Sequence, residues 1–132
     1  MSDVTLGVKW SEVSTLPFIF PEGEYTFQLV GGKDKNGRVE VATSIAEGEH
    51  TGKRYSFSYP NFDDQPWGIR EFKRLSIALG IPIEDNETPL AYLARAVGNT
   101  FSGVIEHREL TDQTTGEKRP FAQLKLASVK PA

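Results

Sequence analysis

Aromatic side chains at alternate positions are the feature of this chain best suited to binding a ligand. The stretch KRYSFSYPNF, residues 53–62, contains Tyr55, Phe57 and Tyr59 with a serine between neighbouring rings. Successive side chains of a β-strand point to opposite faces, so the three rings would share one face. Exposed rings can stack on nucleic-acid bases, whereas inward-facing rings belong to a hydrophobic core. Both interpretations are open from this stretch alone.

Cations near the ends of the predicted strands could hold phosphate groups. Those that flank the aromatic strand and the neighbouring loops are Lys33, Lys35, Arg38, Lys53, Arg54, Lys118 and Arg119. The net charge of −3 argues against a protein that coats duplex DNA through overall basicity. A local groove can still be positive, because charges are screened over about 8 Å at physiological salt. The alternative is that polar loops simply carry lysines, whose charge Asp34, Glu40 and Glu117 dilute.

Little in the sequence supports catalysis. The two histidines, His50 and His107, have no carboxylate or histidine partner at a metal-binding spacing, and both are expected at the surface. The chain contains no cysteine, which excludes thiolate metal sites and cysteine nucleophiles. Asp63 and Asp64 form a carboxylate pair that is more typical of the polar cap of a following helix. The sequence therefore predicts a protein that is not an enzyme, with no catalytic residue, metal site or cofactor.

The length of 132 residues suits a single domain. We expect residues 1–21 to form an extended N-terminal lead-in, because Pro17 and Pro21 bracket its last apolar residues, and residues 22–132 to form the domain. Apolar runs such as residues 16–20 are far shorter than the roughly 20 residues that span a bilayer, so no membrane partner is expected. No signal peptide is recognisable, and the lack of cysteine is compatible with a reducing compartment. The expected localisation is cytoplasmic.

Alternating apolar residues predict five strands, at residues 24–30, 38–45, 53–60, 100–109 and 120–129. The turn-rich stretch 31–37 and the polar stretch 110–119 are predicted loops. Between the third and fourth strands the period becomes helical, with apolar residues at Ile69, Phe72, Leu75 and Leu79. Thr88 can cap a second helix that begins at Pro89. In the first helix we expect Trp67 to pack in the core or at the start of the helix, with a ligand platform as the alternative. We expect Arg70, Lys73 and Arg74 to form a solvated face.

This order of elements predicts a mainly β fold, a five-stranded OB-type barrel with a helical segment between strands three and four. Another small barrel with a helical insertion and an α+β sandwich are the alternatives. OB barrels usually bind ligands across strands two and three, between the loop that joins strands one and two and the loop that joins strands four and five. The cations named above fall at these places in the predicted topology.

The register of the second hairpin decides which way the rings point. If Ile45 pairs with Tyr55 and Thr43 with Phe57, the rings face the core together with the apolar residues of the second strand. A shift of one residue would turn them outward. Tyr59, beside Pro60 at the end of the strand, is expected to be the most accessible ring.

Several short motifs occur along residues 21–100. Gly23 and Tyr25 stand in the first strand, Asn36-Gly37 in a turn, and an apolar second strand follows. A Gly-x-x-x-Gly-Lys turn at residues 48–53 leads into the aromatic third strand, and Leu79-Gly80-Ile81 marks the end of a helix. In these motifs the chain resembles phage-type single-stranded-DNA-binding proteins. The resemblance implies an OB fold that binds single strands without sequence preference during phage replication or recombination. It implies replication or recombination proteins as partners and the host cytoplasm as the location. One departure is the C-terminus, LASVKPA, which is not the acidic tail of many such proteins.

Together these features predict a domain that binds single-stranded DNA without strong sequence preference. The listed cations would hold phosphates, and Tyr55, Phe57 and Tyr59 would offer rings for stacking. The alternative from another functional class is a protein-interaction or inhibitor module that uses the same small β-barrel. The sequence leaves the oligomeric state undetermined.

Overall fold

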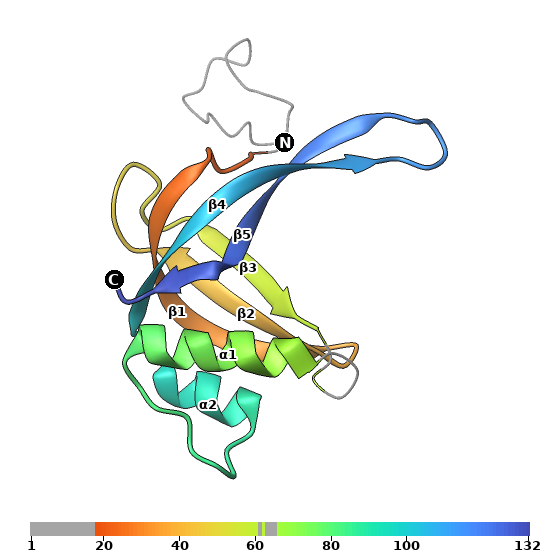
Figure 1. The fold of residues 1–132 in the computed structure, drawn as a ribbon. Coiled ribbons are helices and arrows are strands. Elements are labelled where there is room, and N and C mark those ends of the chain that lie inside the picture. The colour runs from red at the N-terminus through yellow and green to blue at the C-terminus, as the bar shows by residue number, and fades with distance from the viewer. Residues whose placement is uncertain (1–17, 61, 63–65) are drawn as a thin grey trace, which may run out of the picture.

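The architecture is a curled antiparallel sheet covered at one end by two helices (Figure 1). The computed structural model describes residues 18–60, 62 and 66–132. The strands are β1 (Gly23–Lys35), β2 (Arg38–Ile45), β3 (Arg54–Tyr59), β4 (Thr100–Thr111) and β5 (Lys118–Lys130), in the spatial order β3-β2-β1-β4-β5. The helices α1 (Pro66–Leu79) and α2 (Pro89–Ala96) lie between β3 and β4 in the sequence. The predicted mainly β fold with a helical insertion is confirmed.

The first hairpin is tighter than the sequence suggested. β1 continues through Gly31 and Gly32, after a break in register at Leu29, and only Asn36 and Gly37 separate it from β2. Both turn residues have positive φ, 54° and 82°, as a two-residue hairpin turn requires. The prediction of a loop over residues 31–37 is therefore wrong. As a result, Lys33 and Lys35 lie on a strand.

The second hairpin turns the aromatic residues of β3 to the inner face of the sheet. Thr43 pairs with Tyr55, Val41 with Phe57 and Val39 with Tyr59, a register two residues away from the one considered above. A shift of two residues leaves every side chain on the same face. The three rings therefore share the face of buried Val41 and Ile45, whereas Arg54, Ser56 and Ser58 point outward.

The two helices follow the predicted pattern with two exceptions. Phe72, Leu75 and Leu79 of α1 are buried against the sheet, but Ile69 is 54% exposed. Trp67 in the first turn of α1 is 43% exposed, so its expected place in the core is not confirmed. The Oγ1 atom of Thr88 accepts a hydrogen bond from the backbone N–H of Ala91 at 3.2 Å and so caps α2. Tyr92 and Leu93 of α2 are fully buried. The predicted helix cap of Asp63 and Asp64 lies outside the described residues.

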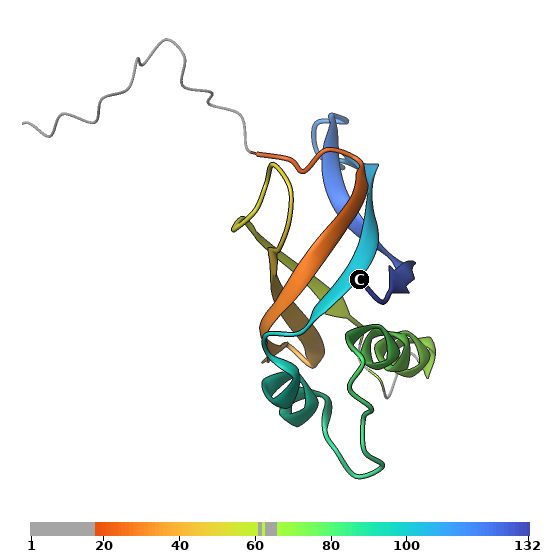
Figure 2. The same cartoon turned by 90° about the vertical axis from the view of Figure 1, so that its left-hand side faces the viewer.

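The sheet curls until its outer strands, β3 and β5, approach each other without pairing (Figures 1 and 2). One side-chain hydrogen bond bridges them, in which the backbone N–H of Leu124 donates to the Tyr55 hydroxyl oxygen at 2.8 Å. The sheet is not closed, so the expected barrel is not confirmed. The open side between β3 and β5 is where the chain offers a cleft.

Beyond the cleft, the distal parts of β4 and β5 extend away from the rest of the sheet as a two-stranded arm (Figure 1). Thr111 still pairs with Lys118, so the turn is shorter than the predicted loop over residues 110–119. The Asp112 side chain accepts a hydrogen bond from the backbone N–H of Thr114 at 2.8 Å, which orders the turn. Lys118 and Arg119 consequently lie on β5 and not in a loop.

Candidate nucleic-acid interface

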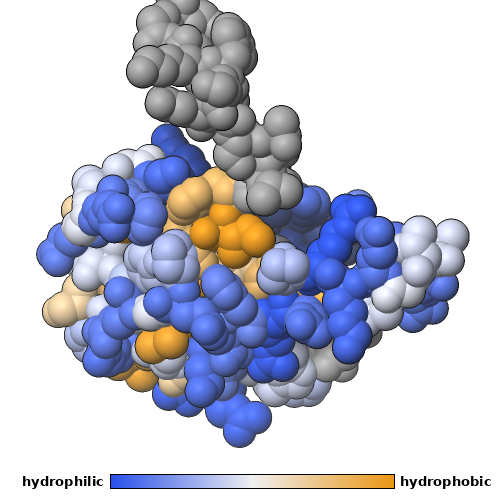
Figure 3. Space-filling view, turned by 90° about the horizontal axis from the view of Figure 1, so that it is seen from above, coloured by the Kyte–Doolittle hydropathy of each residue, from blue (hydrophilic) through white to orange (hydrophobic). Residues whose placement is uncertain are grey.

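A largely apolar cleft of about 950 Å³ lies between the outer strands of the sheet. One wall comes from β3, the other from β5, and the lead-in residues before β1 close the upper end. Its lining residues are Phe18, Ile19, Phe20, Arg54, Tyr55, Ser56, Arg119, Pro120, Phe121 and Ala122. Seen from above, apolar side chains gather in a patch surrounded by hydrophilic ones (Figure 3). The cleft thus combines rings and apolar walls with one arginine from each strand.

Tyr55 forms part of the wall of the cleft and also ties the two strands together. Its hydroxyl oxygen accepts the hydrogen bond from Leu124, and its ring lies 5.8 Å from that of Phe20. Partial burial raises the pKa of the Tyr55 hydroxyl above its ordinary value, and the hydrogen bond from Leu124 opposes that shift. Of the three rings on β3, Tyr55 is the one that lines the cleft.

The expectation that Tyr59 is the most accessible ring is wrong. Its side chain is fully buried, because α1 returns over the end of β3 and places Phe72 5.3 Å from the Tyr59 ring. Burial, with a smaller contribution from Glu71, raises the pKa of Tyr59 far above 10.0. Its hydroxyl has no hydrogen-bond partner among the described residues. Phe57 contacts Tyr59 and Phe101 edge-on, at 5.7 and 6.2 Å, and lies between the two tyrosines.

A second, shallower hollow of about 380 Å³ lies on the outer face of β1, β2 and β3. It is lined by Gly31, Gly32, Lys33, Glu40, Ala42, Thr43, Arg54 and Ser56. Arg54 and Ser56 also line the cleft, so the two hollows adjoin along the outward side of β3. An extended ligand could therefore pass from the cleft onto this face without leaving a lined surface.

The predicted phosphate-binding cations differ in what they contact. Lys33 and Lys35 both lie near the Glu40 carboxylate, at 3.5 and 3.4 Å. Lys118 lies 4.0 Å from Glu109, Arg119 lies 3.7 Å from Glu117, and all four of these side chains are well exposed. Ion pairs at such a surface are worth only about 0–1 kcal/mol, so a phosphate can displace them.

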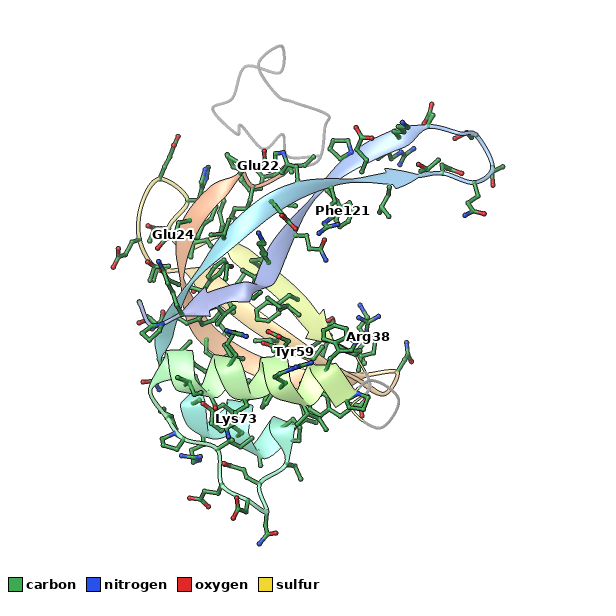
Figure 4. The ribbon with its side chains drawn as sticks, in the orientation of Figure 1. Glu22, Glu24, Arg38, Tyr59, Lys73 and Phe121 are labelled. Carbon is green, nitrogen blue, oxygen red and sulfur yellow. The ribbon has the colours of Figure 1, made fainter. Side chains whose placement is uncertain are left out.

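The remaining predicted cations have no carboxylate partner in the part of the chain that the structure describes. Arg54 lies between the two hollows, and Arg38 stands at the tip of the first hairpin (Figure 4). The Lys53 ammonium lies 3.7 Å above the centre of the Phe18 ring, a cation–π contact. Arg54 and Arg119 are thus brought together at the cleft, whereas Lys33, Lys35 and Arg38 cluster at the hairpin tip.

Sequence reasoning missed two contributors to the cleft. Phe121 on β5 faces the opening from the arm (Figure 4), and residues 18–20 supply its upper wall. Phe121 directly follows Lys118-Arg119-Pro120, and proline within a strand marks an outer edge. An aromatic residue that follows two cations on an outer strand could therefore have identified Phe121 as a candidate from the sequence.

The two histidines hold the lead-in residues against the sheet. The His107 Nε2 atom lies 2.7 Å from the Phe20 carbonyl oxygen, and the His107 backbone N–H donates to Glu22 at 3.0 Å. The His50 ring lies 5.4 Å from that of Phe18. Among residues 18–60, 62 and 66–132, no three histidine or acidic side chains are grouped so that they could hold a metal ion.

The chain matches no protein-family model and no curated protein. Neither helix in the described part of the chain has the length and apolar character needed to cross a bilayer.

Proposed function

We propose that this protein binds single-stranded DNA without strong sequence preference, as an OB-type domain of phage-type replication or recombination. The cleft between β3 and β5 carries the proposal, since it presents apolar and aromatic walls with Arg54 and Arg119 at its sides. Single-strand binders combine these two features, stacking bases on rings and holding phosphates with cations. Phe121, Phe18 and Tyr55 would contact bases, and Tyr59 would not.

The position of the cleft supports the OB interpretation. It lies beside β3 and next to the arm that carries Phe121, whereas the hairpin tip that carries Arg38 lies at the other end of β3 (Figure 4). OB domains bind oligonucleotides across strands two and three, between the loop of strands one and two and the loop of strands four and five. The cleft corresponds to the part of this path next to the arm. An unclosed sheet is compatible with this class, whose barrels are partly open.

Binding of oligo-dT across a salt series tests the proposal. The logarithm of the association constant should fall linearly with the logarithm of the salt concentration, with a slope of about −0.7 for each phosphate neutralised. Arg54→Glu should weaken binding, because it reverses the charge between the two hollows. Lys130→Glu is the matched control, since Lys130 pairs with Glu24 at 3.3 Å outside both hollows. If oligo-dT does not bind at low salt, the proposal is wrong.

A protein-interaction module is the second candidate, and one observation favours it. The cleft lies between two strands that have no neighbour on their outer sides, and such edges can accept an extended peptide as an added strand. Peptide binding would depend on the apolar lining and only weakly on salt. Affinity that stays constant across the salt series would therefore favour this candidate.

A further inference from the structure

The outer face of α1 carries a concentration of positive charge that the proposed cleft does not use. The helix contains Arg70, Lys73 and Arg74 against a single acid, Glu71, on a chain whose net charge is −3. Arg74 pairs with Glu71 at 3.0 Å, whereas Arg70 and Lys73 have no carboxylate partner within the described ranges. Like charges on neighbouring turns of a helix repel each other, so this face gains stability when an anion binds.

The start of α1 lies directly against the end of β3. Phe72 of α1 contacts the rings of both Tyr59 and Phe62, at 5.3 and 5.6 Å. A side-chain carbon at Gly68 would lie 3.0 Å from the Pro60 ring, so the first turn of α1 approaches this segment as closely as a glycine allows. The outward side of β3, which begins at Arg54 beside the cleft, therefore ends where α1 begins.

Arg38, the first residue of β2, lies near the place where β3 ends and α1 begins, which we call the junction. It directly precedes Val39, the residue that pairs with Tyr59 at the end of β3. In Figure 1 the arm, the tip of the β1–β2 hairpin and the start of α1 all lie on the right-hand side. Arg54, Ser56 and Ser58 cover roughly 13 Å along β3, at about 3.3 Å per residue, and connect the cleft to this junction.

We propose that a single-stranded DNA leaves the cleft along β3 and continues over α1, where Arg70 and Lys73 hold its phosphates. This inference rests on the proposed function and adds a second segment to the same site. Trp67, 43% exposed in the first turn of α1, lies at the point where the strand would arrive. The consequence is a binding site longer than the cleft alone provides.

Oligonucleotides of two lengths separate the two segments. Oligo-dT of about 4 nucleotides should fill the cleft only, and oligo-dT of about 16 nucleotides should reach α1, these lengths being the limits for one OB domain. Arg70→Glu should reduce affinity for the long oligonucleotide about fivefold or more at 0.1 M salt, since each phosphate contact contributes about that factor. Its affinity for the short oligonucleotide should not change. Lys73→Glu should behave in the same way.

Lys130→Glu is again the matched control, because it makes the same change in net charge at an exposed position outside both hollows. Equal losses in Arg70→Glu and Lys130→Glu would overturn the inference, and so would a loss in Arg70→Glu that is the same for both lengths. A wild-type protein that binds neither length would instead contradict the proposed function itself. Thermal unfolding of each variant shows that the fold is retained.

Tryptophan fluorescence gives an independent measurement. The chain has two tryptophans, Trp10 and Trp67, so in Trp10→Phe all tryptophan fluorescence comes from Trp67. Oligo-dT of about 16 nucleotides should change this emission, and oligo-dT of about 4 nucleotides should not. Emission that responds equally to both lengths, or to neither while both bind, would contradict a path over α1.

Discussion

The two tyrosines of β3 occupy equivalent places in the palindromic stretch YSFSY, yet the fold gives them opposite surroundings. Tyr55 lines the cleft and its hydroxyl accepts a hydrogen bond from β5. Tyr59 is fully buried under α1, and its hydroxyl has no partner in the described part of the chain. Both rings point to the same face of the sheet, so local pattern does not separate them. The elements that cover each end of the strand make one ring part of a site and the other part of the core.

Removing the Tyr59 ring should have the largest effect. Tyr59→Ala would leave a cavity among Phe57, Phe72 and the neighbouring core, at a cost of about 3–5 kcal/mol in the free energy of unfolding. Chemical denaturation measures this loss. DNA affinity of the fraction that remains folded should be unchanged. Weaker binding with unchanged stability would mean that Tyr59, and not Tyr55, faces the ligand.

Phe121 lines the same cleft as Tyr55, so removing its ring should affect ligand binding more than stability. Phe121→Ala should weaken oligo-dT binding by about 1–3 kcal/mol, the contribution of stacking one base on an aromatic side chain. Phe121 is only partly buried, on an outer strand. The free energy of unfolding should therefore fall far less in Phe121→Ala than in Tyr59→Ala. Fluorescence anisotropy with labelled oligo-dT measures the affinity. An unaltered affinity would remove Phe121 from the proposed site.

Alkaline pH should also distinguish the tyrosines. The pKa of Tyr59 is raised by burial, so above pH 10 the unfolded chain ionises at this residue while the folded chain does not. The stability associated with neutral Tyr59 is thus complete below pH 10 and declines as pH rises, by up to about 1.4 kcal/mol per pH unit. Tyr59→Phe should have a shallower decline than the wild type when unfolding is followed across this range. If the free energy of unfolding declined equally with pH in Tyr59→Phe and in the wild type, the burial of the Tyr59 hydroxyl would be contradicted.

The smallest effects should come from removing each hydroxyl at neutral pH. Tyr55→Phe leaves the backbone N–H of Leu124 without its acceptor and should lower the free energy of unfolding by about 1 kcal/mol. Tyr59→Phe removes a buried hydroxyl that has no described partner, so it should be neutral or stabilising. Hydrogen exchange at the Leu124 amide should speed up in Tyr55→Phe only. Equal exchange in both variants would show that the bond does not hold β5 to β3.

The order of elements was predictable because it depends on local patterns. Alternation over β2 and β3, the helical period after Pro66 and the cap at Thr88 are each determined within about ten residues. The facing of the rings was left open by the pattern, because a shift of one residue would reverse it. The register found differs from the inward-facing register considered by an even number of residues, so the rings face the core. The edges of the elements were less predictable: Gly31 and Gly32 suggested a loop, but a break in register lets β1 continue through them.

The candidate site was only partly predictable, because it joins segments that are distant in the sequence. Arg54 and Tyr55 were identified from β3, and Arg119 from β5. Nothing local places Tyr55 next to Leu124, which lies 69 residues away. The burial of Tyr59 likewise depends on the return of α1 over the end of β3, which no property of YSFSY encodes.

The unclosed sheet has a consequence for self-association. Two strands without outer neighbours, β3 and β5, could join a second copy of the chain edge to edge. Pro120 interrupts the row of N–H donors on β5, and charged Lys118 and Arg119 precede it. Proline and charge on an outer strand discourage such pairing. The β5 edge is therefore protected against joining a second sheet, which leaves the β5 wall of the cleft accessible to a ligand.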